Sequence, residues 1–199
     1  MNTLRYGAVG LIVLLGAAVL WMAANPHVGA DYRAYFIDKT TDCWALPTTG
    51  AVPLNQTISF VGEEATAATR ALRACGWLDA QETGTWSLGP ESRLHLAPRG
   101  LIGDALIDFE IVPFIAKQQP KQTAIISADG TELARWTMTV GATQHATVRV
   151  PHAIAARDGG FVLSLRFPLA ISPAELKINA DRRRLSIRLY ALTIRDAAP

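Results

Sequence analysis

The sequence predicts an all-β fold, an antiparallel β-sandwich of jelly-roll type that occupies residues 77–199. Three observations support this prediction. Six or more short segments alternate apolar and polar side chains with a period of two, turn residues separate these segments, and no helical pattern between them is long enough for a parallel crossover. Two antiparallel sheets packed face to face account for all three observations.

The expected strands follow one another from residue 105 to the end of the chain. They are ALIDFEIVPF at 105–114, the two apolar runs on either side of Asp129-Gly130, HATVRVP at 145–151, GFVLSLRFP at 160–168 and RLSIRLYALTI at 184–194. Asp-Gly between two apolar runs is a strong signal for a tight hairpin. In the last segment the apolar phase shifts by one between Leu189 and Leu192, which predicts a bulge, a bend or a strand buried on both faces.

The N-terminal part of the chain is strongly apolar. GAVGLIVLLGAAVLWMAA at 7–24 contains no charge and, as a helix, would reach about 27 Å, close to the hydrocarbon thickness of a bilayer. We expect a transmembrane signal anchor in the inner membrane, with a single pass and the later residues in the periplasm or extracellular space. A cleaved signal peptide, with VGA at 28–30 near the cleavage site, and a buried soluble helix remain alternatives.

The remaining segments complete the expected organisation. The acids Glu63 and Glu64 suit a helix start and Gly76 suits a helix stop. The chain thus divides into a cytoplasmic N-terminus at 1–6, the membrane anchor at 7–24, an extended arm at 25–62 that lies on the main domain, a short helix at 63–76 and the β-sandwich at 77–199.

Cys43 and Cys75 are the only cysteines. In an oxidising compartment an even number of cysteines favours a disulfide, which would tie the predicted helix to the arm. Two buried free thiols are the alternative. A zinc site is not expected, because no histidine lies at ligand spacing from the pair.

Charge and motifs exclude several classes of function. A net charge of +2 is too small to indicate a nucleic-acid-binding protein. The sequence has no nucleophile elbow, phosphate-binding glycine loop or zinc-protease motif, so we expect neither an enzyme nor a cofactor. A glycosidase pair assembled from distant strands stays open, because its spacing exists only in three dimensions.

Three consecutive arginines, Arg182, Arg183 and Arg184, precede the last strand. Before them, Ser172-Pro173-Ala174-Glu175 has the form of a capping box that starts one helical turn. One interpretation of the triplet is a structural pair with Asp181 plus solvated charge. The other is an anion or phosphoglycan contact through the guanidinium groups.

Tryptophan side chains are the other candidates for ligand contact, because a flat ring with a hydrogen-bond donor can stack on a sugar. Trp86 is favoured over Trp136 and Trp77 because it follows Gly84 and lies near a turn at Gly89-Pro90. The acids that flank Trp86 and would accept hydrogen bonds from hydroxyl groups are Glu82 and Glu91. Core packing is the alternative for each tryptophan.

Residues 76–199 also resemble a poorly characterised extracytoplasmic domain at the C-terminal ends of bacterial multi-pass glycosyltransferases and phosphoglycerol-transferase-like envelope proteins. The resemblance rests on Gly76-Trp77, ETGTWSLGPESRLHL, VPF, the ADG hairpin, Val150-Pro151 and the ending LRFPLAISPAELKINADRRRLSIRLYALTI. The ending keeps Ser172, Pro173, Leu176, Asp181 and Leu185, but has Lys177 and Ser186 where glycines are usual. The resemblance implies a sandwich like that of carbohydrate-binding modules, beside envelope glycan synthesis, and no catalytic residues.

We therefore expect a membrane-anchored, noncatalytic module that binds envelope polysaccharide or a lipid-linked sugar, or docks on a multi-pass membrane glycosyltransferase. The alternatives are a structural subunit of a membrane complex and a glycan-processing hydrolase.

Overall fold

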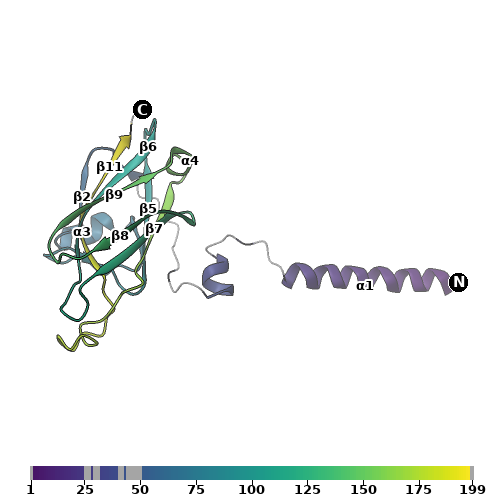
Figure 1. Cartoon of the computed structure of the whole chain (residues 1–199). Helices are drawn as coiled ribbons and strands as arrows, with labels where there is room; N and C mark the ends of the chain where they lie inside the picture. The colour runs from purple at the N-terminus through teal and green to yellow at the C-terminus, as the bar shows by residue number, and fades with distance from the viewer. Residues whose placement is uncertain (1, 25–27, 29–31, 40–42, 44–50, 198–199) are drawn as a thin grey trace. The chain divides into compact units, whose positions relative to one another are not determined.

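The computed structural model describes residues 2–24, 28, 32–39, 43 and 51–197 (Figure 1). The chain forms two compact units, Met1–Thr40 and Thr41–Pro199. The first unit contains the helix α1 (Asn2–Ala24) and the π-helical turn η1 (Arg33–Ile37). Its described apolar side chains between Leu11 and Met22 are 57% to 72% exposed. No helix within the described ranges is both long and apolar enough for a membrane crossing.

The second unit is a β-sandwich, as predicted. One sheet has six strands: β1 (Ala51–Val52), β5 (Glu91–Pro98), β10 (Phe161–Arg166), β7 (Gln122–Ala128) and β8 (Thr131–Met138) in spatial order, with β3 (Arg73–Cys75) also paired to β5. The other has five: β2 (Thr57–Ser59), β11 (Ile187–Ala197), β6 (Asp104–Pro113) and β9 (Gln144–Val150), with β4 (Thr85–Trp86) also paired to β11. The short helix α4 (His152–Ala155) follows β9. Only β1 pairs in parallel among the described strands.

The core lies between the two sheets, where the period-two alternation buries one face of each. On β6 every second side chain from Ala105 to Ile111 is at most 1% exposed, and on β10 the inward set begins at Phe161 and includes Leu163 and Leu165. The ring of Phe109 on β6 meets the ring of Trp136 on β8 edge to face, 5.4 Å between centroids. This aromatic pair links the two layers.

Two local devices set the strand register. Asp129 and Gly130 have φ angles of 44° and 85°, as the two central residues of a type I′ turn require, and they connect β7 to β8. The register of β11 against β6 shifts between Leu189 and Ala191, so the bulge alternative is confirmed. The extra residue returns Leu192 to the core, where it is 0% exposed.

The segment before Trp77 differs from the prediction in two ways. The expected helix at 63–76 ends early: α3 covers Glu63–Thr69, and Arg73–Cys75 pair with β5 as β3. The expected arm at 25–62 is also wrong for its last part, because β1 and β2 join the two sheets and Phe60 is 0% exposed in the core. Residues 25–27, 29–31, 40–42 and 44–50 of the arm, with most of the alternative cleavage site, lie outside the described residues.

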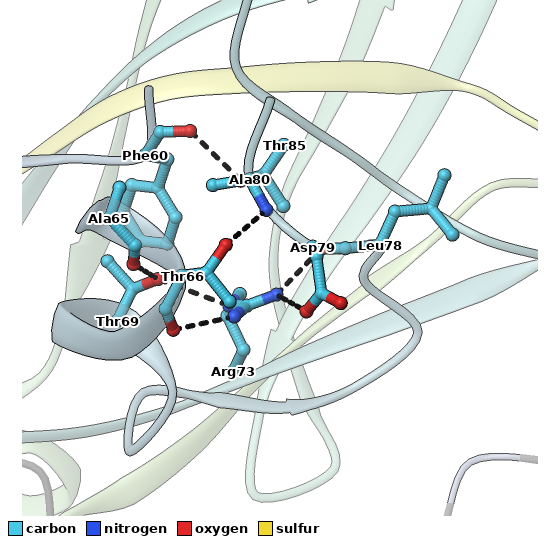
Figure 2. A network of polar contacts seen from close by, with 9 residues as sticks. All are labelled: Phe60, Ala65, Thr66, Thr69, Arg73, Leu78, Asp79, Ala80 and Thr85. Atoms are coloured by element: carbon cyan, nitrogen blue, oxygen red, sulfur yellow. Dashed lines mark hydrogen bonds and ion pairs between the residues drawn. The ribbon is translucent and has the colours of Figure 1, made fainter. Parts of the chain in front are cut away.

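Arg73 ties the end of α3 to the loop that follows it (Figure 2). Its Nη2 donates to the carbonyl of Thr66 at 2.9 Å, its Nη1 to the carbonyl of Leu78 at 2.6 Å, and its Nε to Oγ1 of Thr69 at 3.1 Å. Thr69 in turn donates to the carbonyl of Ala65 at 2.6 Å. The guanidinium therefore satisfies the carbonyl of Thr66 near the C-terminal end of α3 and that of Leu78 in the loop, and so fastens α3 to this loop.

The predicted disulfide between Cys43 and Cys75 is confirmed, with 5.7 Å between the Cα atoms and a sequence separation of 32. It joins β3 to the segment that precedes the sandwich. The two-thiol alternative is thereby excluded.

Candidate functional site

The outer face of the five-stranded sheet collects the side chains that alternate with the core residues of its strands. These are Trp86 on β4, Arg188, Tyr190, Thr193 and Arg195 on β11, Asp108, Glu110 and Val112 on β6, and His145, Thr147 and Arg149 on β9. The face is therefore largely polar and charged, with apolar side chains at Leu106 on β6 and at its β4 end.

At the β4 end, four side chains form what we name the Arg188 cluster: Trp86, Phe114, Arg188 and Tyr190. The guanidinium carbon of Arg188 lies 5.0 Å from the centroid of the Trp86 ring and 5.2 Å from that of the Tyr190 ring. Trp86 also contacts Phe114 edge to face, at 5.9 Å between centroids. The cation is thus held against two aromatic rings, an arrangement that their quadrupoles stabilise.

The strand pairing creates this arrangement. Trp86 lies directly opposite Arg188 in the register of β4 and β11, and Tyr190 occupies the bulge. Gly84 brings β4 close, because a Cβ at this position would lie 2.8 Å from the carbonyl oxygen of Leu189, and its φ of 102° also suits glycine. The short strand β4 and the bulge together place two rings beside one guanidinium.

Arg188 has no polar partner among the residues that the structure describes. Its Nε is buried and donates to no acceptor among the described residues. Nη1 and Nη2 have no acceptor there either, but they are not buried and so reach solvent. In the part of the chain that the structure describes, none of the three nitrogens makes a hydrogen bond or an ion pair. A buried donor without an acceptor costs about 1–3 kcal/mol, and more when it is charged. Such a group in a native fold calls for an explanation.

The other arginines on this face have carboxylate partners. Arg195 donates through Nε to Asp108, and this hydrogen bond is the main reason that the pKa of Asp108 is lowered; Thr147 adds a 2.7 Å hydrogen bond to the same carboxyl group. Arg149 donates to Asp104 at 3.2 Å. The pKa of Asp104 is lowered first by the hydrogen bond from the backbone N–H of His152 and then by Arg149.

Glu110 is different from these two aspartates. It lies opposite His145 in the register of β6 and β9. The next residue on the same face of β6 is Val112, which lies opposite Arg188 on β11. Over the described ranges its carboxylate forms neither an ion pair nor a hydrogen bond. Among the outward side chains of β6 and β11 that the structure describes, Arg188 and Glu110 are thus two charged groups near Trp86 that form no ion pair.

Among the residues predicted from sequence, only Trp86 lies in this cluster. Trp136 packs against Phe109 at the edge of the core. Glu91 forms an ion pair with the buried Arg93 at 2.8 Å, and Glu82 is exposed in the turn before Gly84. Trp77 donates its ring N–H to the carbonyl of Arg93 at 3.0 Å, so its indole has a structural partner.

The three arginines at 182–184, which lie at the corner before β11, contact mainly other parts of the sandwich. Arg183 makes hydrogen bonds of 2.7 to 3.1 Å with both oxygens of Asp181, so the structural pair with Asp181 is confirmed. Arg184 donates through Nε and Nη2 to the carbonyl of Ala170 at 3.0 and 2.6 Å. Arg182 is exposed. A ligand contact of the triplet stays a prediction.

The capping box before the corner is also confirmed. Ser172 Oγ accepts from the N–H of Glu175 at 3.2 Å, and the Glu175 carboxylate accepts from the N–H of Ser172 at 2.9 Å. A single turn follows, which Leu176 anchors with 5% of its surface exposed. This turn fixes the corner from which β11 starts.

A cavity of about 390 Å³ lies elsewhere, at the loop between α4 and β10. It is lined by Ala51, Ala97, Pro98, Arg99, Ala156, Arg157, Asp158, Gly159 and Gly160. Arg157 in its wall is paired with Asp129. The cavity shares no residue with the Arg188 cluster. Across the described segments, no three histidine, cysteine, aspartate or glutamate side chains are grouped so that they could hold a metal ion.

Sequence reasoning missed Arg188, Tyr190 and Glu110. For Arg188 and Glu110 the available signal was their phase, because each lies between two buried residues of an alternating strand; Tyr190 lies where this phase breaks at the bulge. That phase predicts an outward side chain, but it does not tell which outward side chains are neighbours or which of them lack a partner.

Comparisons with known proteins give structural likeness only. No protein-family model matches the chain, and no curated protein matches it. One similar solved structure is the CBM36-1 domain of a multidomain xylanase from the hindgut metagenome of Trinervitermes trinervoides, with 12% identity, a TM-score of 0.37 and coverage of 58% of this chain and 80% of that chain. Another is the K1 cleaved adhesin domain of Lys-gingipain from Porphyromonas gingivalis W83, with 14% identity, a TM-score of 0.36 and coverage of 58% and 75%. These values assign the chain to no family.

Proposed function

We propose that the sandwich is a noncatalytic glycan-binding module and that the Arg188 cluster is its binding site. The observation that carries this proposal is the placement of the half-buried Trp86 and Tyr190 side chains beside a guanidinium without a partner among the described residues, on the outer face of a sheet whose inner face forms the core. Aromatic faces stack on the apolar faces of sugar rings. Polar groups beside them, here Arg188 and Glu110, donate to and accept from sugar hydroxyl groups.

The carboxyl groups on this face favour binding over hydrolysis. A glycosidase needs two carboxyl groups that flank one bond, and its general acid has a raised pKa. Asp108 and Asp104 are held by arginines, and both have lowered pKa values. A carboxyl group with a lowered pKa is a poor proton donor, so neither of them is suited to act as the general acid. Glu110 alone does not make a catalytic pair with them.

The test of glycan binding compares the wild type with Trp86→Ala and Tyr190→Ala on an array of neutral and acidic glycans and on envelope polysaccharide. Each substitution should reduce binding at least tenfold, since stacking of a sugar on the aromatic ring is lost while the core is untouched. Trp136→Phe is the matched control, because it changes a tryptophan outside the cluster, and should bind like the wild type. Wild-type protein that binds no glycan would refute the proposal.

We also propose that the module is held at the outer side of the inner membrane. The charge-free segment at 7–24 supports attachment, and the Cys43–Cys75 disulfide supports an oxidising compartment. The resemblance to glycosyltransferase-associated domains makes such an enzyme the proposed neighbour. Fractionation of cells tests the location: the full chain should stay with membranes at alkaline pH and its sandwich should be cleaved by protease added to spheroplasts. Release at alkaline pH would contradict the attachment.

Crosslinking in these spheroplasts tests the neighbour separately. Crosslinked material should contain a multi-pass glycosyltransferase, whereas recovery of cytoplasmic proteins alone would contradict both the location and the partner.

A further inference from the structure

We infer that the Arg188 cluster binds the acidic group of its glycan, so that the ligand class is an acidic polysaccharide rather than a neutral one. This inference rests on the proposed function and deepens it. The acidic group would be a sugar carboxylate or a sugar phosphate, which share the chemistry that a guanidinium recognises: two oxygens that accept two parallel hydrogen bonds.

The first step is the direction from which Arg188 can be reached. Trp86 and Tyr190 both lie within 5.2 Å of the guanidinium carbon, and Nε is buried. The terminal nitrogens reach solvent. An approaching ligand therefore meets the outer edge of the guanidinium, where Nη1 and Nη2 each point an N–H group in the same direction and so form a two-pronged fork. This is the edge that binds a carboxylate or phosphate with two hydrogen bonds.

The second step is the charge that the fold leaves uncompensated. On the same face Arg195 pairs with Asp108 and Arg149 pairs with Asp104, so carboxylates are available to arginines on this sheet. Among the described residues Arg188 pairs with no carboxylate, and Glu110 is not within ion-pair distance of it. A neutral glycan would leave this charge unpaired, whereas an acidic group would pair with it.

The third step is the stiffness of the fork. The ring contacts and the opposite position of Trp86 fix the side chain in one place on β11 before any ligand arrives. Binding then loses little side-chain entropy, which is the usual cost of an arginine contact. Trp86 and Tyr190 thus do two things in the same site: they offer faces to the sugar ring and they position the guanidinium.

The experiment measures binding of the full chain in detergent to pairs of glycans that differ only in charge. One pair is polygalacturonate and its carboxyl-reduced form. The other is a phosphorylated mannan and the same mannan after phosphatase treatment. The acidic member of at least one pair should bind at least tenfold more tightly, and the pair that shows the difference identifies the acidic group.

Two variants assign the difference to Arg188. Arg188→Lys keeps the charge but loses the fork, and should lower the affinity for the acidic member about tenfold. Arg188→Gln should abolish the preference for the acidic member. Arg166→Gln is the matched control, because Arg166 is an exposed arginine on β10 of the other sheet. Circular dichroism and the thermal midpoint of each variant establish that it is folded.

The outcomes separate the two proposals. Equal binding of the acidic and neutral members would overturn this inference and leave glycan binding in place. An acidic preference that persists in Arg188→Gln would overturn the role of Arg188. Absence of binding to every glycan would refute the proposed function itself. If Arg188→Gln does not fold, the lysine variant decides. An unchanged acidic preference in Arg188→Lys would show that two parallel hydrogen bonds from the guanidinium are not what binds the acidic group.

Discussion

Arg73 shows how one buried polar side chain can organise a segment. Its side chain is 8% exposed, and its guanidinium donates to carbonyls on both sides of the loop after α3, with Asp79 as an additional partner at 3.4 Å. Because Asp79 is 86% exposed, the ion pair contributes little, and the hydrogen bonds to the backbone carry the stabilisation. The loop itself is fixed by a further hydrogen bond from the N–H of Ala80 to Thr66 Oγ1.

Replacing Arg73 by lysine should therefore lower the free energy of unfolding by about 1–3 kcal/mol, since an ammonium group cannot reach Thr66, Thr69 and Leu78 together and leaves buried carbonyls without donors. Urea unfolding monitored by tryptophan fluorescence measures the change. Arg70→Lys is the control, because Arg70 is exposed on the same segment, and it should have no effect. Equal stability of the two variants would show that the network in Figure 2 is not stabilising.

Asp181 gives the fold a specific sensitivity to acid. The hydrogen bonds from the Arg183 side chain, and then from its backbone N–H, lower the pKa of Asp181 from 3.8 to about 2. A carboxyl group whose pKa is lower in the folded state stabilises the protein above its ordinary pKa, and this stabilisation is lost as the pH falls toward the folded value.

The stability of the wild type should consequently fall between pH 3.8 and about 2, and Asp181→Asn should show a smaller fall in that window. Part of the fall will remain, because Asp104, Asp108 and Glu175 also have lowered pKa values. Urea midpoints at pH 5, 3 and 2 provide the measurement. A variant that loses stability as steeply as the wild type would rule out this pair as a source of acid sensitivity.

At the scale of elements, local patterns predicted what local forces determine. The Asp129-Gly130 hairpin follows from two residues that accept positive φ, and the bulge at Tyr190 follows from the shifted phase of Leu189 and Leu192. The end of α3 could not be predicted in this way, because residues 73–75 keep a helical pattern and become a strand only through pairing with Leu94 and Arg93 of β5. That pairing is a tertiary contact, which overrides helix propensity.

The disulfide belongs to this scale, since it fastens β3 to the chain before the sandwich. With a separation of 32 residues, its loss should lower the free energy of unfolding by about 3–4 kcal/mol in the chain-entropy model. The double variant Cys43→Ser/Cys75→Ser should therefore unfold at lower urea than the wild type.

A reducing agent should lower the wild type to the level of this double variant and leave the variant itself unchanged. Wild-type protein that runs at the same position on reducing and nonreducing gels would contradict the disulfide.

At the scale of the whole molecule, the sequence predicts two layers but not the order of strands within them. Period-two alternation tells which side of a strand is buried, and this was sufficient for the core on β6 and β10. It does not tell that β11 lies between β2 and β6, or that β4 adds to its edge. The candidate site depends on those neighbours, which is why the local sequence makes Trp86 a candidate and does not point to Arg188. The jelly-roll class and the membrane-facing location stay predictions.

The two sheets also give two tryptophans opposite tasks, and this can be measured. Trp136 contacts Phe109 across the layers, so Trp136→Ala should lower the free energy of unfolding by about 2–4 kcal/mol because it leaves a cavity beside the core.

Trp86→Ala removes a ring from the outer face, where water can replace its contacts with Arg188 and Phe114. It should lower the free energy of unfolding by less than half as much as Trp136→Ala. Glycan binding at a temperature well below both unfolding midpoints should show the reverse order, with Trp136→Ala like the wild type and Trp86→Ala at least tenfold weaker. If Trp136→Ala loses binding as well while still folded, the site includes the edge of the core, and the separation between a packing layer and a binding face is wrong.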